Sequence, residues 1–138
     1  MITRNKYGVL RNQYQGLYKK VVCVCSAGCL RSPTAAFVLS QKPFDFNTRA
    51  VGVDRNYAII PITEELIVWA DEIVCMDNTH LHLLKGAASE FSEGGANILE
   101  AKPVIVLDIP DNFEYREPML MNLIKQRYIE KTNFGQDN

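Results

Sequence analysis

The sequence predicts an α/β fold in which a four-stranded parallel sheet carries helices on both faces. Short apolar runs rich in β-branched residues alternate with helical patterns along most of the 138 residues, which is typical of crossover connections over a parallel sheet. The first run, Lys20 to Cys25, is apolar without alternation, as expected for a strand that is covered on both sides. A chain of this length has room for one compact domain.

The further elements each have a local signal. Pro33 suits a first helical turn because its missing N–H would have no partner there, and Thr63 and Asp77 are typical N-cap residues. Strands are predicted at residues 20–25, 49–53, 72–76 and 103–107, and helices at residues 34–39, 64–70, 80–85 and from about 118 onward. The last helix has an apolar face of period close to 3.6, formed by Leu120, Leu123, Ile124 and Tyr128.

Two segments fit this scheme less well. Residues 86–101 are small, polar and rich in glycine, and we expect them to form a mobile surface connection. In residues 1–19, basic side chains alternate with tyrosine and leucine, which predicts either a short amphipathic helix packed on the domain or a frayed arm. We therefore divide the chain into an N-terminal extension, residues 1–19, and a domain, residues 20–138.

Composition limits the function classes. The net charge is −1, from 15 Lys plus Arg against 16 Asp plus Glu, whereas nucleic-acid-binding domains are usually clearly basic. No apolar run approaches the roughly 20 residues that span a bilayer, and the first residues lack the pattern of a secretory signal. Near-neutral charge and short apolar runs lead us to expect no nucleic-acid or membrane partner. Three of the four cysteines crowd into seven positions, so we expect reduced thiols and a cytoplasmic location.

The segment whose residues suggest a reactive site follows the first strand and reads VVCVCSAGCLRSPTAA. Backbone N–H groups of such a loop can surround a tetrahedral dianion, and the following helix adds partial positive charge. Arg31 has a planar fork that matches two phosphoryl oxygens. The same field would stabilise Cys25 as a thiolate nucleophile, to which Ser32 can donate a hydrogen bond. The expected phosphate-binding residues are Ser26, Ala27, Gly28, Cys29, Leu30, Arg31 and Ser32.

Chance is the alternative explanation of this spacing, because a cysteine at a strand end is often a buried small hydrophobe. The preceding strand, the following helix, the glycine within the loop and the Ser-Pro pair after Arg31 together favour a phosphate-binding loop. The other two cysteines, Cys23 and Cys75, lie within predicted strands, and we expect both in the core.

These motifs resemble the low-molecular-weight protein tyrosine phosphatase family, and in particular its bacterial and phage branch. That branch has a C-S-x-N-x-L-R-S-P-T-A loop, a W-A-D segment before the third strand and an L-D-I-P-D turn after the fourth. Here the corresponding segments are CSAGCLRSPTA at 25–35, WAD at 69–71 and LDIPD at 107–111. The resemblance covers Lys20 to Tyr128.

The resemblance implies a sheet in the order 2-1-3-4 and hydrolysis of phosphomonoesters through a cysteinyl-phosphate, without metal or other cofactor. It implies a phosphorylated protein, above all phosphotyrosine, or a small phosphomonoester as substrate. It also implies phosphate, sulfate or vanadate as ligands or inhibitors.

Two loop positions depart from the family. Gly28 replaces an asparagine, and because both residues tolerate left-handed backbone conformations the loop can keep its shape. The side-chain hydrogen bonds of the asparagine would be lost, which implies a softer loop or lower activity. Cys29 lies one position earlier than the second loop cysteine of the family. A disulfide between Cys29 and Cys25, and a plain packing role for Cys29, both remain open.

A phosphatase of this kind also needs an acid that protonates the leaving oxygen. The turn after the fourth strand is the natural source, because the carboxyl ends of parallel strands share one edge of the sheet. We favour Asp111, which matches the Asp of the P-D-P-Y type of motif in the family, and keep Asp108 as a supporting residue or alternative acid. Phe113 or Tyr115 would wall the pocket, although either can be core and the turn can be an ordinary acidic surface loop.

The sequence gives weaker support to other functions and to other candidate sites. Loss of the loop asparagine at position 28 keeps open a phosphate- or phosphopeptide-binding module with weak or no turnover. Arsenate reductase chemistry needs resolving thiols beyond the loop, where the sequence has only Cys75. His80 and His82 point to different faces of a helix, so we expect no shared metal and two solvated or partly packed rings. Trp69 lies on an apolar helical face and is expected in the core.

Overall fold

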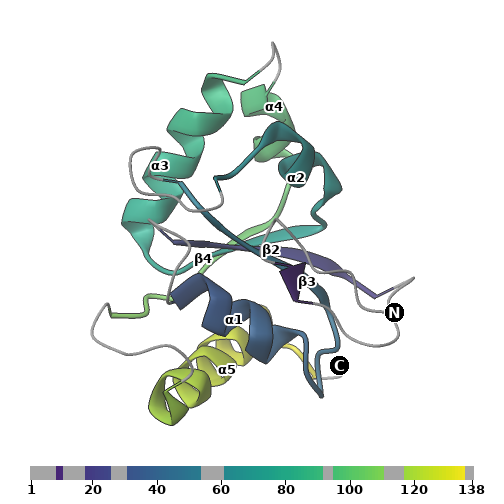
Figure 1. The fold of residues 1–138 in the computed structure, drawn as a ribbon, viewed down its shortest axis with the longest axis vertical. Helices are drawn as coiled ribbons and strands as arrows, with labels where there is room; N and C mark the ends of the chain where they lie inside the picture. The colour runs from purple at the N-terminus through teal and green to yellow at the C-terminus, as the bar shows by residue number, and fades with distance from the viewer. Residues whose placement is uncertain are drawn as a thin grey trace.

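The structure is a computed structural model that describes residues 9–10, 18–25, 31–53, 61–91, 95–110 and 117–135. Its strands and helices alternate along the chain as the sequence predicts (Figure 1). In order they are β1 (Val9–Leu10), β2 (Lys20–Cys25), α1 (Arg31–Leu39), β3 (Asn47–Gly52), α2 (Glu64–Trp69), β4 (Glu72–Cys75), α3 (Asn78–Ser89), α4 (Gly95–Glu100), β5 (Val104–Val106) and α5 (Pro118–Thr132).

The sheet has the order β1-β3-β2-β4-β5. Strands β3, β2, β4 and β5 are parallel to their neighbours, so the predicted four-stranded sheet in the order 2-1-3-4 is confirmed. β2 lies in the middle, with Cys25 opposite Gly52 of β3 and Val24 opposite Cys75 of β4. The carboxyl ends of these strands therefore lie together at one edge.

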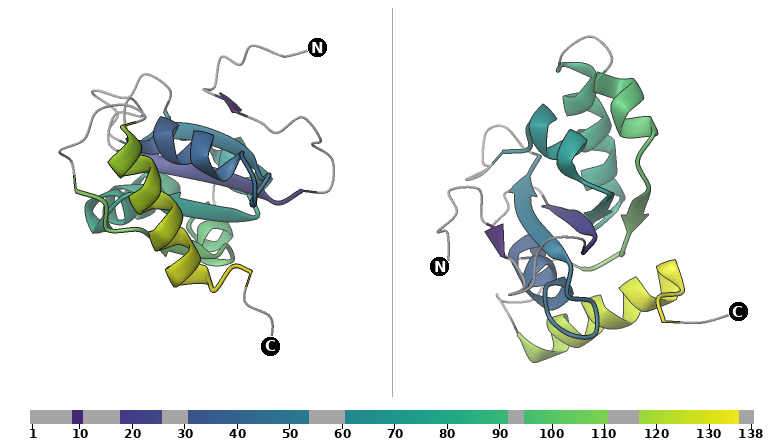
Figure 2. Two further views of the ribbon diagram at one scale, coloured as in Figure 1. Left: turned by 90° about the horizontal axis from the view of Figure 1, so that it is seen from below. Right: turned by 90° about the vertical axis from the view of Figure 1, so that its right-hand side faces the viewer.

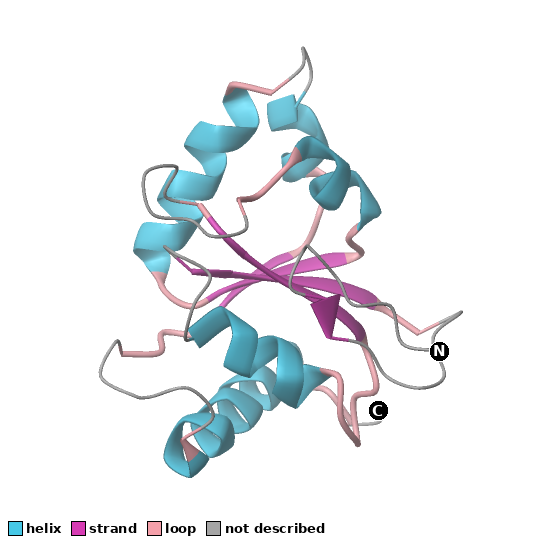
Figure 3. Cartoon of the chain, in the orientation of Figure 1, coloured by secondary structure: helices cyan, strands magenta, loops and turns pink. Residues whose placement is uncertain are grey.

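Helices cover both faces of the sheet, as predicted. In Figures 1 and 3, α1 and α5 lie on one side of the strands and α2, α3 and α4 on the other. Two separate apolar clusters correspond to these two layers. Alternate residues of β2 contribute to each: Val21, Cys23 and Cys25 face α1 and α5, whereas Val22 and Val24 face the other layer. The central strand is therefore buried on both sides, which explains its uninterrupted apolar sequence.

The caps lie where the sequence places them. Thr63 Oγ1 accepts a hydrogen bond from Leu66 N at 3.2 Å, and Asp77 caps α3. Pro118 is the first residue of α5, whose buried face consists of Leu120, Ile124 and Tyr128. Among the described residues, no helix is both long and apolar enough to cross a bilayer.

The expectation of a mobile connection at residues 86–101 is wrong for most of that segment. α3 extends to Ser89, four residues beyond the predicted end, and α4 forms at Gly95–Glu100. Ala88 and Leu99 are buried in the cluster beneath these helices. Burial of these side chains therefore stabilises helices that the glycine-rich sequence argues against.

The N-terminal extension also differs from its expectation at two of the positions that the structure describes, Val9 and Leu10. Val9 and Leu10 form neither a helix nor a frayed arm but a short strand antiparallel to β3, with Val9 opposite Arg49 and Leu10 opposite Thr48. The two further views in Figure 2 show this strand at the edge of the sheet. Its backbone groups pair with an edge that the four parallel strands leave open.

Candidate active site

Cys25 is the last residue of β2, and α1 begins at Arg31. Its side chain is buried, and Sγ lies 3.1 Å from Oγ of Ser32 in the first turn of α1. The main chain of Cys25 is fixed by a hydrogen bond from Val53 N to its carbonyl oxygen at 3.0 Å. The thiol is thus held at the carboxyl edge of the sheet, beside a hydroxyl group and a helix N-terminus. The loop residues Ser26, Ala27, Gly28, Cys29 and Leu30 lie outside the described residues.

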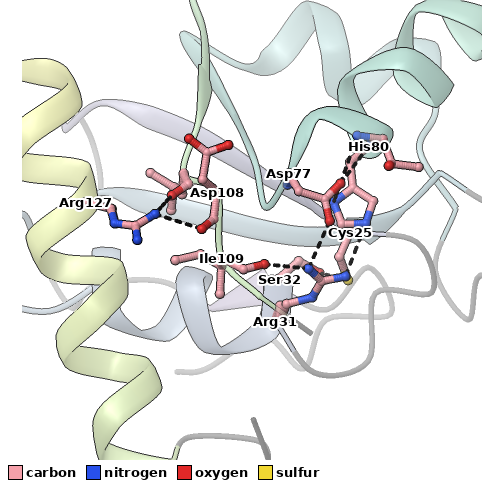
Figure 4. Close-up of polar contacts among 10 residues, drawn as sticks. Cys25, Arg31, Ser32, Asp77, His80, Asp108, Ile109 and Arg127 are labelled. Carbon is pink, nitrogen blue, oxygen red and sulfur yellow. Dashed lines mark hydrogen bonds and ion pairs between the residues drawn. The ribbon is translucent and has the colours of Figure 1, made fainter. Parts of the chain in front are cut away.

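Arg31 is almost completely buried, with 6% of its surface exposed. Its Nη1 donates to the carbonyl oxygen of Ile109 at 2.8 Å and to Oδ2 of Asp77 at 3.1 Å. Its Nη2 lies 3.4 Å from Nε2 of His80. These partners follow β5, follow β4 and lie in α3, so residues from separate segments fix the guanidinium plane beside Cys25 (Figure 4).

Asp77 joins the cap of α3 to this arginine. Its Oδ1 accepts from the backbone N–H groups of Thr79 at 2.8 Å and His80 at 3.4 Å, while Oδ2 accepts from Arg31. In return, His80 Nδ1 accepts from Asp77 N at 3.2 Å. Partial burial raises the pKa of the Asp77 carboxyl, but attraction by His80 and these hydrogen bonds outweigh it and lower the pKa below its usual value. Asp77 is therefore an ionised partner of Arg31 at neutral pH.

The two histidines differ from each other. His82 is exposed, but His80 is 1% exposed and packs against the guanidinium, so the expectation of a solvated or partly packed ring is wrong for His80. Sequence reasoning identified Asp77 only as a helix cap. The available signal was its position directly after a strand of the parallel sheet, which brings it to the same edge as Cys25.

Asp108 turns away from this group of residues. It has a left-handed backbone, φ 58°, and its carboxylate accepts a hydrogen bond from Lys131 of α5 at 2.9 Å. Arg127 of α5 donates to the carbonyl oxygens of Leu107 and Asp108, both at 2.7 Å. In Figure 4, Asp108 lies beside Arg127, whereas Cys25 lies on the Arg31 side. The other expected residues of this turn, Asp111, Phe113 and Tyr115, lie outside the described residues.

The remaining cysteines of the described chain are core residues, as predicted. Burial, and then the charge of Glu72, raises the pKa of the Cys23 thiol well above its ordinary value. Burial likewise raises the pKa of Cys75 to about 12. Both therefore remain protonated and unreactive at neutral pH. Trp69 is partly buried against the core and stacks on Arg49, whose guanidinium carbon lies 4.0 Å from the ring centroid.

Metal ligation has no support in the described ranges, where no three His, Cys, Asp or Glu side chains are grouped in a way that could hold an ion. His80 and His82 in particular face different environments.

No family model and no curated protein matches the sequence. The fold of this chain is similar to those of several phosphatases of known structure. The tyrosine phosphatase Wzb from Escherichia coli K30, determined with phosphate, is 16% identical, with a TM-score of 0.61, and the match covers 86% of this chain and 100% of that one. Wzb from Vibrio vulnificus, determined with benzylphosphonate, is 19% identical, with a TM-score of 0.55 and coverage of 84% and 95%.

The YwlE arginine phosphatase from Geobacillus stearothermophilus is 18% identical, with a TM-score of 0.54, and the match covers 87% of this chain and 99% of that one. Its match, like those to the two Wzb structures, extends over nearly the whole neighbour, so the likeness is one of complete domains. The chain has the fold of the low-molecular-weight phosphatases, as the sequence motifs led us to expect.

Proposed function

We propose that the protein is a metal-independent cysteine phosphatase that hydrolyses phosphomonoesters. One observation carries the proposal: a buried arginine, fixed by Asp77 and the Ile109 carbonyl, lies at the same sheet edge as the Cys25 thiol. A buried guanidinium beside a helix N-terminus is suited to an oxyanion. An ordinary core cysteine would have apolar neighbours instead.

In the proposed reaction, Cys25 Sγ attacks phosphorus in line, and the bond to the leaving oxygen breaks with its electron pair. Asp111 donates a proton to that oxygen. Arg31 and the loop amides hold the phosphoryl oxygens as charge redistributes, which is catalysis by positioning and electrostatic stabilisation. Water, deprotonated by Asp111, then attacks the cysteinyl-phosphate and releases phosphate and the thiolate.

We propose Asp111 as the acid in preference to Asp108. The Asp108 carboxylate is paired with Lys131 on the α5 side, and an acid that points away from the thiol has no route to the leaving oxygen. Substitution distinguishes the two. Asp111→Asn is expected to slow the first chemical step by about 100-fold or more, whereas Asp108→Asn keeps a residue that tolerates a left-handed backbone and changes the rate little. A larger loss in Asp108→Asn would reverse the assignment.

Phosphotyrosine is the proposed substrate, with Phe113 or Tyr115 against its ring. Neighbours of the same fold include a tyrosine phosphatase and an arginine phosphatase by their names, so the decisive comparison is between phosphotyrosyl and phosphoarginyl peptides of one sequence. A ratio of kcat/KM above about 10 for phosphotyrosine supports the proposal, and the reverse ratio replaces it with phosphoarginine.

The primary test is hydrolysis of p-nitrophenyl phosphate in the presence of EDTA, with vanadate as inhibitor. Cys25→Ser is expected to abolish turnover and to retain vanadate binding. A protein that binds vanadate but shows no turnover with either aryl phosphates or phosphopeptides would be a binding module instead. Arsenate reduction is disfavoured, because Cys75 is the only cysteine beyond the loop and is buried with a raised pKa.

A further inference from the structure

Arg127, in the middle of α5, binds the chain where it leaves β5. It donates from Nη1 to two successive carbonyl oxygens, those of Leu107 and Asp108, each at 2.7 Å. Lys131, one helical turn later, binds the Asp108 carboxylate at 2.9 Å. The backbone and the side chain of one residue are thus both held by α5.

The backbone at this point has an unusual shape. Asp108 has φ 58°, a conformation that non-glycine residues adopt at a cost and that surrounding contacts must maintain. Its neighbours Leu107 and Ile109 are fully buried. Their N–H groups donate to carbonyl oxygens of β4 and the residue after it, Leu107 N to Cys75 O at 2.9 Å and Ile109 N to Met76 O at 2.8 Å.

The direction of the carbonyl groups changes along this segment, after the left-handed residue. Those of Leu107 and Asp108 point to Arg127, whereas that of Ile109 accepts from Arg31 at 2.8 Å. Figure 4 shows this segment between the two arginines, Arg127 from α5 on one side and Arg31 from α1 on the other. The arginine expected to bind phosphate and a second arginine, which no part of the proposed reaction requires, therefore fix the same short segment.

This segment leads directly to the proposed acid, because only Pro110 separates Ile109 from Asp111. We propose that Arg127 is a positioning residue for the general acid: by holding the carbonyl oxygens of Leu107 and Asp108, it maintains the left-handed turn from which the chain continues to Asp111. The inference rests on the proposed function and extends it to a residue that does not contact substrate.

Dependence on the leaving group distinguishes this role from a general structural one. A leaving group that is a strong base needs protonation, whereas 2,4-dinitrophenolate departs without it. Loss of the acid's position therefore lowers kcat/KM for phenyl phosphate and spares that for 2,4-dinitrophenyl phosphate. Loss of fold or of the phosphate site lowers both equally. Because kcat/KM reports the first irreversible step, it isolates cleavage of the ester from hydrolysis of the cysteinyl-phosphate.

The experiment compares Arg127→Met with Lys125→Met in the full chain. Lys125 is exposed on the same helix, so the control removes the same charge without touching the strand end. Arg127→Met is expected to lower kcat/KM for phenyl phosphate at least about tenfold, part of the 100- to 10,000-fold that a general acid supplies. It should lower kcat/KM for 2,4-dinitrophenyl phosphate less than about threefold, and Lys125→Met should change neither.

A double-mutant cycle with Asp111→Asn tests whether Arg127 acts through the acid. Once the acid is absent, Arg127→Met should cause less than a twofold further loss with phenyl phosphate, because the two residues act as one unit. Equal losses for both substrates, or fully additive losses, would overturn the inference while leaving the phosphatase proposal intact. A wild-type chain without Cys25-dependent turnover would overturn both.

Arg127→Lys serves if the methionine variant does not fold. One ammonium group cannot match the guanidinium contacts to both carbonyl oxygens, so the selective loss with phenyl phosphate should persist at a smaller size. Lys131→Met removes the contact to the Asp108 carboxylate but leaves both carbonyl contacts, and its leaving-group dependence should stay within twofold of wild type. A selective loss in Lys131→Met equal to that in Arg127→Met would assign the positioning to the carboxylate and refute the proposed role of the backbone carbonyls.

Discussion

Arg31→Lys tests the site most directly, because it keeps the positive charge and removes the planar fork. In the structure, Nη1 of Arg31 bonds both the Ile109 carbonyl and Asp77, and Nη2 lies 3.4 Å from Nε2 of His80, so these partners together orient the guanidinium. A lysine ammonium is a point charge on a flexible stem. It cannot keep these anchors and also present two parallel N–H groups to a phosphoryl group.

The magnitude follows from the hydrogen bonds that the lysine cannot make. One charge-assisted hydrogen bond to the phosphoryl group is worth about 1.5–3 kcal/mol. The hydrogen bond to Ile109 O is present in the free enzyme as well, so its loss lowers stability and does not add to the barrier that kcat/KM reports. The Asp77 ion pair adds little, because that side chain is 34% exposed. A loss of about 1.5–3 kcal/mol corresponds to a fall in kcat/KM of about 10- to 160-fold, at 1.36 kcal/mol for each factor of ten.

The assay is steady-state hydrolysis of p-nitrophenyl phosphate, with vanadate affinity measured on the same samples. Arg49→Lys is the matched control, since Arg49 stacks on Trp69 and lies opposite Val22 of β2, three residues before Cys25, and kcat/KM should stay within about twofold. If Arg31→Lys reduced kcat/KM less than about threefold, or if both variants lost activity equally, the geometry of the guanidinium would not be the basis of catalysis.

Three further expectations concern the described fold. Asp77→Asn should make the free energy of unfolding less dependent on pH in the acid range. The pKa of Asp77 is lowered in the folded protein, so the unfolded chain takes up the proton first; the stabilisation is present above about pH 4 and is lost as pH falls through the lowered value. The urea midpoints of variant and wild type should therefore converge below that range. Ile124→Ala should lower the free energy of unfolding by about 2–5 kcal/mol, because the side chain is fully buried, whereas the exposed Met119→Ala should change it by less than about 0.5 kcal/mol. Iodoacetamide at pH 8 should leave Cys23 and Cys75 unmodified in the native protein and modify both in urea, because burial keeps them protonated; peptide mass spectrometry would reveal native labelling, which would contradict their placement in the core.

The parts of the fold that the sequence predicts correctly have local or strongly periodic signals. The apolar run of β2 requires burial on both faces whatever its neighbours are. Thr63 and Asp77 act on N–H groups within three residues, so their capping role needs no knowledge of the tertiary structure. The same holds for Pro118, which suits the first turn of α5.

The parts that the sequence does not reveal depend on distant residues. His80 is buried because it meets Arg31, 49 positions earlier in the chain, and Arg31 meets the Ile109 carbonyl 78 positions later. Neither contact leaves a pattern near the residue itself. α4 has only six residues and is stabilised by burial of Leu99 against the sheet layer rather than by helix propensity.

The two edges of the sheet show why the proposed chemistry belongs at the carboxyl ends. At the opposite edge, Lys19 Nζ lies 3.2 Å from both Glu72 Oε2 and Tyr128 Oη, and the tyrosine donates to Glu72 Oε1 at 2.7 Å. Burial and this hydrogen bond to Glu72 raise the pKa of Tyr128, which keeps it a neutral donor. Cation and carboxylate neutralise each other there.

At the Cys25 edge, Arg31 is also paired with the Asp77 carboxylate, but this pairing does not cancel the positive potential there. Arg31 is itself the first residue of α1, so the partial positive charge of the helix N-terminus adds to the guanidinium. The Asp77 carboxylate is divided between the arginine and the N–H groups of its own helix cap. The balance at this edge therefore favours a bound phosphoryl group, and this asymmetry between the two edges is the physical basis of the proposed activity.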